Sequence, residues 1–272
     1  MKPRVAGVLQ VRWGDMKNEL FCGDCLEIMP SLSGVDCVIA DPPYGTTQCK
    51  WDAVLPFDQM WAAIDGCCKQ AAAICMTASQ PFSSALVMSN PTMFKHEWVW
   101  IKNRGSNFTN TVREPMKEHE MVIVFSKGKW TYNKQMQERT GGGASRVQYN
   151  VTFSGQEREG TRQFKERATN ALPKMRVPSS WQKFNTEVGL HPTQKPVALM
   201  EYLVKTYTNP GDTVLDFCMG SGTTGVACAK QGRRFVGIEQ DAEHFATARG
   251  RIEDALREGA DLFAGVHTPN RN

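Results

Sequence analysis

The sequence predicts an α/β fold built on a mostly parallel sheet. Short apolar runs alternate with amphipathic stretches, and the runs are apolar on both faces, as strands covered by two layers of helices are. A polar and basic segment interrupts this pattern near the middle of the chain. With 272 residues, the chain has room for one large domain with an insertion or for two domains.

The first half supplies the expected strands at 19–23 (ELFCG), 36–41 (DCVIAD) and 71–79 (AAAICMTAS). A helical pattern, FDQMWAAIDGCCKQ at 57–70, separates the last two runs and suggests a parallel crossover. HEWVWIK at 96–102 and EMVIVFSKGKW at 120–130 then read as a closing pair of strands.

The middle of the chain carries the positive charge. Residues 102–186 hold 16 Lys and Arg against 7 Asp and Glu. Aromatic residues alternate with these cations, a mixture typical of surfaces that neutralise phosphates and stack on bases, although an ordinary solvated insertion is the plain alternative. The stretch 133–190 is rich in Gly, Arg, Gln and Thr, and we expect it to be loop-rich and partly ordered only with a partner bound.

The last part returns to the alternating pattern. PVALMEYLVKTYT at 196–208 predicts an amphipathic helix that begins at a proline, which suits a first turn. DTVLDF at 212–217, TTGVACAKQG at 223–232 and RRFVGIEQD at 233–241 predict strand, helix and strand. A long charged helix, AEHFATARGRIEDALREG, follows at 242–259.

The nine cysteines lie mostly in apolar strands and helices, so we expect reduced, packed thiols in a cytoplasmic protein. Cys22 and Cys25 have CxxC spacing, but no second CxxC and no paired histidines accompany them, so a zinc site is disfavoured and no metal is expected. No apolar stretch approaches the roughly 20 residues that span a bilayer.

A glycine-rich turn points to a nucleoside. In DFCMGSGTTG, Gly220, Gly222 and Gly225 form GxGxxG between a predicted strand and helix, and Glu239 ends the next strand. Such glycines let backbone approach a ligand, and the carboxylate can bind both ribose hydroxyls. Asp216 precedes the turn and disfavours a diphosphate there. It suits S-adenosylmethionine, which carries a sulfonium and an ammonium group.

Two other motifs stand out. HPTQKP at 191–196 is a rigid polar loop before a helix, and its Thr193 and Lys195 are placed to bind the carboxylate of an amino acid. DPPYG at 41–45 leaves an apolar run through an acid, two prolines and a ring. Alone, it would be a turn after a strand.

Together, DPPYG, HPTQKP and LDFCMGSGTTGVA resemble the amino-group DNA methyltransferases of the beta arrangement. The resemblance implies a Rossmann-like, S-adenosylmethionine-dependent methyltransferase sheet that is circularly permuted. The catalytic half would span 1–132, an inserted target recognition region 133–190, and the cofactor half 191–272. It also implies double-stranded DNA as partner, a homodimer, and a bacterial or phage-encoded enzyme in the cytoplasm.

The resemblance assigns roles to individual residues. The catalytic motif is Asp41, Pro42, Pro43 and Tyr44. Asp24 corresponds to the acid beside the cofactor adenine, and Glu239 to the ribose-binding acid. Cys218 stands where the family usually has Phe, with Phe217 adjacent. The full expected cofactor set is Asp24, Cys25, Asp41, His191, Thr193, Lys195, Asp216, Phe217, Cys218, Gly220, Ser221, Gly222, Thr223, Thr224, Glu239 and Gln240.

DPPYG then has a chemical meaning. The carboxylate of Asp41 and the carbonyl of Pro42 would accept hydrogen bonds from an exocyclic amino group and stabilise the positive charge that grows on it. Two prolines stiffen the loop, and the ring of Tyr44 would stack on a base extruded from the duplex. In the family, cytosine-N4 enzymes more often begin this motif with Ser, so Asp41 favours N6 of adenine, with cytosine N4 as the near alternative.

Two interpretations from other classes stay open. A nicotinamide or flavin oxidoreductase would explain GSGTTG and Glu239, but it leaves DPPYG, HPTQKP and the basic middle without a role. A DNA-binding protein that has lost catalysis is the second, although all the expected catalytic residues are present.

Overall fold

The computed structural model describes residues 18–46, 52–138, 175–187 and 194–264, with side chains up to 258. The chain divides into two compact units. The larger unit comprises Met1–Asn133 and Ser180–Asn272, and the smaller one Lys134–Ser179.

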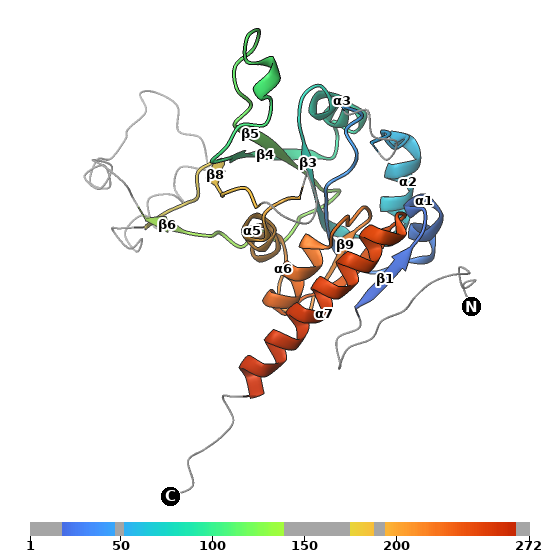
Figure 1. Ribbon diagram of the computed structural model, residues 1–272. Helices are drawn as coiled ribbons and strands as arrows, with labels where there is room; N and C mark the ends of the chain where they lie inside the picture. Colours follow the sequence, from blue (N-terminus) through green and yellow to red (C-terminus); the bar gives the residue numbers. More distant parts are fainter. Residues whose placement is uncertain (1–17, 47–51, 139–174, 188–193, 265–272) are drawn as a thin grey trace, which may run out of the picture. The chain divides into compact units, whose positions relative to one another are not determined.

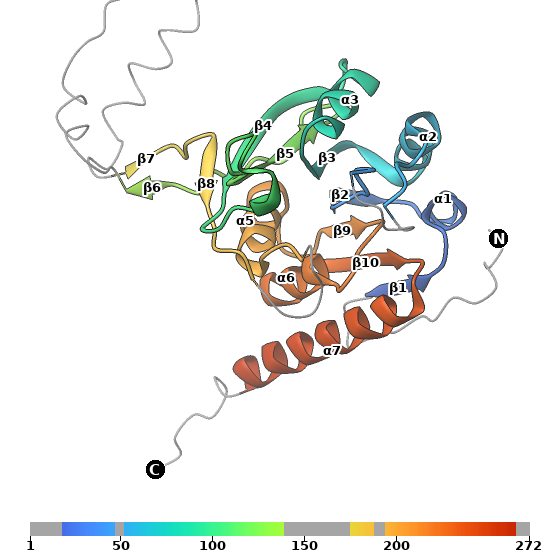
Figure 2. The ribbon, with the colours of Figure 1, turned by 45° about the horizontal axis from the view of Figure 1, so that its top comes forward.

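An eight-stranded sheet forms the centre of the larger unit (Figures 1 and 2). All neighbouring pairs are parallel except those made by β5, which is antiparallel to both of its neighbours. The α/β fold with a mostly parallel sheet is thus confirmed, as is the closing pair β4 and β5. In spatial order the strands are β1 (Glu19–Cys22), β10 (Arg234–Glu239), β9 (Thr213–Asp216), β2 (Val35–Ala40), β3 (Cys68–Ala78), β5 (His119–Phe125), β4 (Phe94–Ile101) and β8 (Trp181–Lys183).

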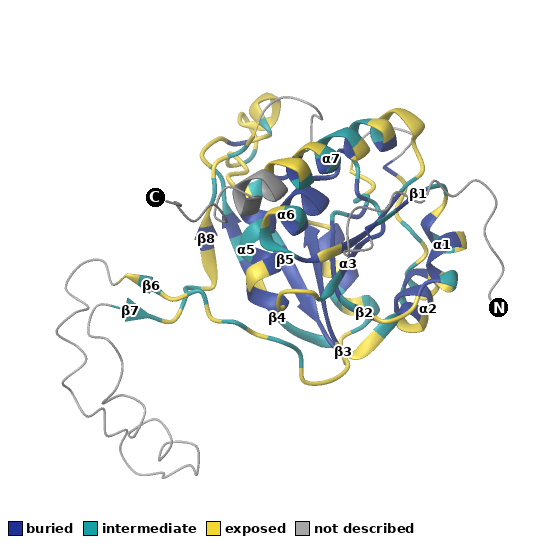
Figure 3. Ribbon diagram, turned by 90° about the horizontal axis from the view of Figure 1, so that it is seen from below, coloured by how far each residue is buried: buried dark blue, intermediate teal, exposed yellow. Residues whose placement is uncertain are grey.

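Helices cover both faces of this sheet, and the strands alternate their side chains between two apolar cores. One core joins the sheet to α5 (Val197–Tyr207), α6 (Thr223–Gln231) and α7 (Ala242–Ala264). The other joins it to α1 (Cys25–Ile28), α2 (Phe57–Cys67) and α3 (Phe82–Ser89). In β2, for example, Cys37 and Ile39 face the first core, and Val38 and Ala40 face the second. Figure 3 shows the strands between the helices as mostly buried.

Strands from the two ends of the sequence meet in the middle of the sheet. β9 pairs in parallel with β2 through Cys37↔Val214 and Val38↔Leu215. From this pair the chain continues outward in opposite directions, from β9 to β10 and from β2 to β3. Such a change of direction is a topological switch point, and α/β proteins bind ligands in the crevice at the carboxyl ends of these strands.

The expected loop-rich segment 133–190 is described only in part. In the smaller unit, β6 (Gln137–Glu138) pairs with β7 (Met175–Arg176), antiparallel. Residues 139–174 and 188–190 lie outside the described residues, so the expected ordering on partner binding stays a prediction. Trp181–Lys183, also inside the expected insertion, forms β8 and pairs with β4 in the main sheet.

Other details differ from the sequence analysis. The helix expected at 57–70 ends at Cys67, and the next residues lengthen β3, because they pair beside the start of β2. α3 was not predicted; it is apolar on most sides and has little amphipathic pattern. Two 3₁₀ turns, η1 (Met29–Ser31) and η2 (Phe108–Asn110), complete the elements of the described residues. None of the helices among the described residues is long and apolar enough to cross a membrane.

Two helical glycines make a matched test of this packing. A Cβ at Gly225 in α6 would lie 2.8 Å from Cε1 of Phe235 and closer still to Ile252, whereas a Cβ at Gly250 in α7 meets nothing within 4 Å. We expect Gly225→Ala to destabilise the fold by about 1–3 kcal/mol through overpacking. Gly250→Ala should stabilise it by about 0.5–1 kcal/mol. Thermal unfolding of both variants measures this, and equal shifts would contradict the packing described.

Candidate active site

The predicted site residues lie where neighbouring parallel strands end. Asp24 follows β1, Glu239 ends β10, Asp216 ends β9 and Asp41 follows β2. These strands are consecutive in the sheet, and their carboxyl ends share one edge. The fold therefore gathers four acids from distant parts of the sequence at the switch point.

Asp41 is held by contacts from three directions. Its Oδ1 accepts hydrogen bonds from the hydroxyl of Tyr44, at 2.7 Å, and from the hydroxyl of Thr77 at the end of β3. Its Oδ2 accepts one from Nζ of Lys195, at 2.7 Å. A carboxylate offers about four acceptor positions. The contacts given by the described residues occupy three of them, and the remaining position is on Oδ2.

A row of alternating charges continues from Asp41. Nζ of Lys195 lies 3.4 Å from Oε2 of Glu120, and Oε1 of Glu120 pairs with Lys102. The Lys195 side chain is only 7% exposed. Burial lowers the pKa of Lys195, but the charges of Asp41 and Glu120 outweigh burial and leave this pKa above its usual value. Lys195 therefore stays a cation near neutral pH.

The loop after Asp41 is shaped by a second acid, Asp52. Its carboxylate accepts the backbone N–H groups of Tyr44, at 2.8 Å, and of Gly45 and Thr46, both at 2.9 Å. Gly45 has φ +68°, a backbone conformation that residues with a side chain rarely adopt. The carboxylate of Asp52 thus holds the turn that follows the motif and fixes the backbone position of Tyr44.

The ring of Tyr44 already has neighbours. It stacks on Phe82 at 5.1 Å between ring centroids, with an interplanar angle of 22°, and Nζ of Lys195 lies 5.6 Å from its centroid. Burial, followed by the charges of Asp41 and Glu120, raises the pKa of the Tyr44 hydroxyl well above its usual range. The hydroxyl therefore stays a hydrogen-bond donor to Asp41. The expected stacking of this ring on a base stays a prediction.

The glycine turn after β9 has room beside it. Gly220 and Gly222 have φ +51° and +79°. A Cβ at Gly220 would meet nothing within 4 Å, whereas one at Gly222 would lie 2.9 Å from Ala248 of α7. Gly222 thus permits close helix packing, and Gly220 leaves open space next to the backbone. The amide of Gly220 donates to Oε2 of Glu239 at 2.8 Å, which joins the turn to the end of β10.

Asp216 is buried at this turn, with 3% of its surface exposed. Burial raises its pKa to about 7, against the opposing effect of hydrogen bonds from Thr224 and from the amide of Cys218. Nearby Asp41 and Glu239 raise it further. A cationic ligand would restore the charge of this carboxylate. The carboxylates of Asp216 and Glu239, together with the open space at Gly220, fit a ligand that carries a positive group and a ribose.

The residues around Asp216 answer the question raised by Cys218. Phe217 is buried in the core with α1, α2 and α3. Cys218 packs against the same core but is only partly buried, and burial, followed by the charge of Asp216, raises the pKa of its thiol well above its usual range. Of these two side chains, Cys218 is therefore the less buried one, at the position where the family usually has Phe.

The other expected cofactor residues are placed unevenly. Asp24 caps α1 by accepting the amide of Leu26 at 2.8 Å, and Cys25 is buried behind it, with its pKa raised to about 11 chiefly by burial. Thr223 and Thr224 are buried at the start of α6, and Gln240 is exposed. His191 and Thr193 lie outside the described residues. The predicted binding of a cofactor carboxylate by Lys195 stays a prediction.

Sequence reasoning missed several residues of the site. Thr77 and Asp52 contact the catalytic motif, and Glu120 and Lys102 continue the row of charges beyond Lys195. Arg251 of α7 donates to the carbonyl and hydroxyl of Ser221 at 2.6 and 2.9 Å. Thr77 and Glu120 were detectable in principle, since each is polar at the end or start of an apolar strand at this edge.

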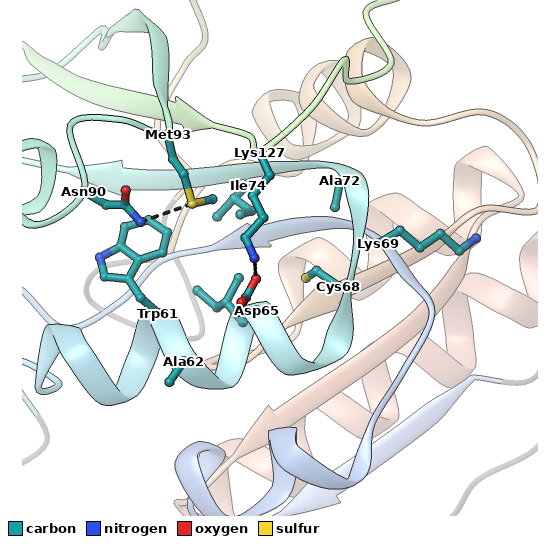
Figure 4. Close-up of a pocket in the computed structure, with 11 residues that line it drawn as sticks. Trp61, Ala62, Asp65, Cys68, Lys69, Ala72, Ile74, Asn90, Met93 and Lys127 are labelled. Atoms are coloured by element: carbon teal, nitrogen blue, oxygen red, sulfur yellow. Dashed lines mark hydrogen bonds and ion pairs between the residues drawn. The ribbon is translucent and has the colours of Figure 1, made fainter.

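A separate cavity of about 240 Å³ opens at the opposite edge of the sheet (Figure 4). It lies where β3 begins and beyond the end of β5, between Cys68 and Lys127. Lys127 pairs with Asp65 across it. No predicted site residue lines this cavity. Among the described residues, no group of His, Cys, Asp and Glu is arranged to hold a metal.

Comparisons with known proteins agree with this geometry. The sequence model of the family described as "DNA methylase" matches residues 35–250. The chain is 25% identical to the DNA adenine methyltransferase YhdJ of Escherichia coli (strain K12) over 96% of this chain and 91% of that protein. It is 27% identical to the type II methyltransferase M1.MboII of Moraxella bovis, over 84% and 92%.

Solved structures show the same fold. The crystal structure of the M1.HpyAVI–SAM complex matches with a TM-score of 0.58 at 28% identity, covering 85% of this chain and 98% of that one. The cytosine-N4-specific PvuII DNA methyltransferase matches with a TM-score of 0.60 at 15% identity, covering 90% and 93%. At that identity, the second match concerns the fold alone.

The role of Asp52 can be tested directly. Asp52→Asn removes the charge that the three amides share, and hydrogen bonds to a charged group contribute about 1.5–3 kcal/mol each. We expect the amide hydrogens of Tyr44, Gly45 and Thr46 to exchange with solvent tenfold faster or more, because the loop would open locally more often. Asp58→Asn, at an exposed acid in α2, is the control. Unchanged exchange in Asp52→Asn would show that the loop does not depend on this carboxylate.

Proposed function

The chain belongs to the DNA methylase family, and on this premise we propose that it transfers a methyl group from S-adenosylmethionine to N6 of adenine in double-stranded DNA. The observation that carries the proposal is the position of Asp41, with one acceptor position left on Oδ2, across the switch point from Asp216 and Gly220. The resemblance inferred from DPPYG, HPTQKP and the glycine turn is confirmed at the level of the family.

The cofactor would lie along the ends of β9 and β10. Asp216 would hold the ammonium group of the cofactor, and Glu239 would bind its ribose hydroxyls. The turn at Gly220 would lie against the amino acid part of the cofactor. Both Glu239 oxygens already accept one backbone amide, from Gly220 and from Asp241, which orients the carboxylate while leaving further acceptor positions. When bound, S-adenosylmethionine supplies a methyl group on a positively charged sulfur.

The protein's own groups would act on the amino nitrogen of the base. Oδ2 of Asp41 would accept one N–H, and the carbonyl of Pro42 would accept the other. These two acceptors favour a pyramidal nitrogen and stabilise its growing positive charge. As the bond between nitrogen and methyl carbon forms, the bond from that carbon to sulfur would break and leave S-adenosylhomocysteine, and the nitrogen would then lose one proton to solvent. Tyr44, Thr77 and Lys195 keep the carboxylate in place before the base arrives, so no reorganisation is required during the reaction.

Adenine is favoured over cytosine by two facts. The motif begins with Asp41, whereas the resembling cytosine-N4 enzymes more often begin it with Ser. YhdJ, which aligns with 96% of the chain, is described as a DNA adenine methyltransferase. We further propose that the enzyme works in the cytoplasm of a bacterium, or is phage-encoded, and that it forms a homodimer.

Sequencing of DNA methylated by the purified protein, with detection of both modified bases, tests the proposal and identifies the recognition sequence. We expect N6-methyladenine at one sequence. N4-methylcytosine would overturn the choice of base but keep the reaction class. Absence of methylation, together with binding of NAD rather than S-adenosylmethionine, would overturn the reaction as well.

Asp41→Ala should abolish methyl transfer and leave cofactor binding intact, because Asp41 acts on the base. We expect a rate at least about 100-fold lower, the typical effect of removing one preorganised acceptor or donor, with the Kd for S-adenosylmethionine changed less than about threefold. Single-turnover methylation and calorimetry measure the two quantities. Asp254→Asn, at an exposed acid of α7, controls for loss of charge. A near-normal rate in Asp41→Ala would refute this role.

The pKa of Asp216 predicts how cofactor binding depends on pH. With its pKa at about 7, the free protein carries a neutral Asp216 below that pH, and a cationic ligand must displace the proton. The Kd for S-adenosylmethionine should therefore rise about tenfold as pH falls from 8 to 6. The Asp216→Asn variant should bind S-adenosylmethionine more weakly and lose the dependence of Kd on pH. This loss distinguishes titration of Asp216 from titration of the cofactor's own amino group, which the variant would keep. An unchanged pH profile in Asp216→Asn would disprove the role.

A further inference from the structure

The loop between β4 and β5, residues 102–118, exposes apolar side chains although it is firmly built. It rises from the sheet in Figure 1 and carries the short turn η2. Phe108 is 64% exposed and Val112 92% exposed. Single exposed apolar residues are common on protein surfaces, but these two lie together at the tip of one projecting loop and form a small exposed apolar patch.

The loop is held in shape from within. The side chain of Asn107 donates to Glu114 and to the carbonyl of Pro115, both at 3.1 Å, and accepts the amide of Lys117 at 2.6 Å. The two arms meet closely, since a Cβ at Gly105 would overlap the side chain of Met116. The exposed tip is therefore presented by a framework of internal hydrogen bonds and close packing.

The base of this loop lies beside the catalytic carboxylate. Lys102 follows β4 and Glu120 lies in β5, and the two are paired. Glu120 also lies 3.4 Å from Nζ of Lys195, which binds Asp41. β4 ends and β5 begins at the same edge as the ends of β2 and β3. Hence the loop projects from the edge at which the target base has to arrive.

The chemistry of the loop suits nucleic acid. Arg104, Arg113 and Lys117 are exposed on the loop. Of its two acids, Glu114 is engaged by Asn107, and Glu118 is exposed at the base of the loop. Cations of this kind approach phosphates, and apolar side chains that accompany them insert between base steps. Extruding a base costs a few kcal/mol, which a side chain that replaces it in the stack can offset.

We propose that the 102–118 loop is a DNA wedge, in which Phe108, assisted by Val112, enters the duplex next to the target and supports the extruded base. This rests on the proposed function, since it requires that the enzyme methylate a base in duplex DNA. It assigns a DNA contact outside the 133–190 segment. Phe108 is a positioning residue here, since it acts on the duplex and not on the reacting atoms.

The test compares two duplexes that contain the sequence methylated by the wild-type enzyme. In one, the target adenine is paired normally; in the other, it faces an abasic site, which makes extrusion easier. On paired DNA, Phe108→Ala should lower the single-turnover rate about tenfold or more, which corresponds to about 1.4 kcal/mol. On the abasic duplex its rate should return to within about threefold of wild type. Phe108→Leu, which keeps an apolar side chain, should retain most of the rate on both.

Two controls make the outcome specific. Met88→Ala removes an equally exposed apolar side chain, 72% exposed, near the end of α3 and the opposite edge of the sheet, and should match wild type on both duplexes. Asp41→Ala should stay inactive on both, because its defect is chemical. An unchanged Kd for S-adenosylmethionine shows that the Phe108→Ala variant is folded. If that variant does not fold, Val112→Ser replaces it in the same comparison of the two duplexes.

The outcomes separate the wedge from the proposed function. If the wild-type enzyme methylates no DNA, the proposed function fails. If it does, but Phe108→Ala keeps its rate on paired DNA, or loses it equally on both duplexes, the wedge alone is refuted. A 2-aminopurine in place of the target adenine adds a readout without chemistry. Its fluorescence should rise with wild type and much less with Phe108→Ala.

Discussion

The site depends on one pairing, that of β9 with β2. This parallel ladder joins Thr213–Asp216, near the end of the sequence, to Val35–Ala40, near its beginning. All strands that run in this direction end at one edge, so the pairing alone brings Asp216 and Asp41 to neighbouring positions. A shift of one residue in this register would exchange the two faces of β9 and move its terminal acid away from Asp41.

The strength of that pairing comes from the cores on both sides. Val214 and Leu215 of β9 are fully buried and face opposite cores, so neither side of the strand can slip without losing apolar contacts. The glycine turn follows directly, and it is tied to α7 by Gly222 against Ala248 and by Arg251 on Ser221. The cofactor side of the site is thus built on rigid elements, with open space beside Gly220.

Much of this was accessible from the sequence, because strands and glycine turns leave local patterns. Apolar runs placed β1, β2, β9 and β10, and the order of DPPYG, HPTQKP and GSGTTG identified the family. Contacts between distant segments left no such pattern. Lys195 and Asp41 are 154 positions apart, and no periodic pattern in the sequence predicts their contact. β8 is too short for periodicity to be recognised, and the low amphipathicity of α3 hid it among apolar residues.

The charges behind Asp41 show why the missed residues matter. Lys195 is the buried member of the ion pair, and an unpaired buried cation would be costly, so the carboxylate of Asp41 supplies the opposite charge that it needs. Lys195 by itself would also repel the positive charge that develops on a methylated nitrogen. Glu120 stands on the other side of Lys195, and Lys102 in turn balances Glu120. Because two cations alternate with two anions, the group as a whole is neutral, while the anion closest to the substrate remains Asp41. The same row anchors both ends of the 102–118 loop, so the acceptor for the amino group and the proposed wedge are positioned by one set of ion pairs.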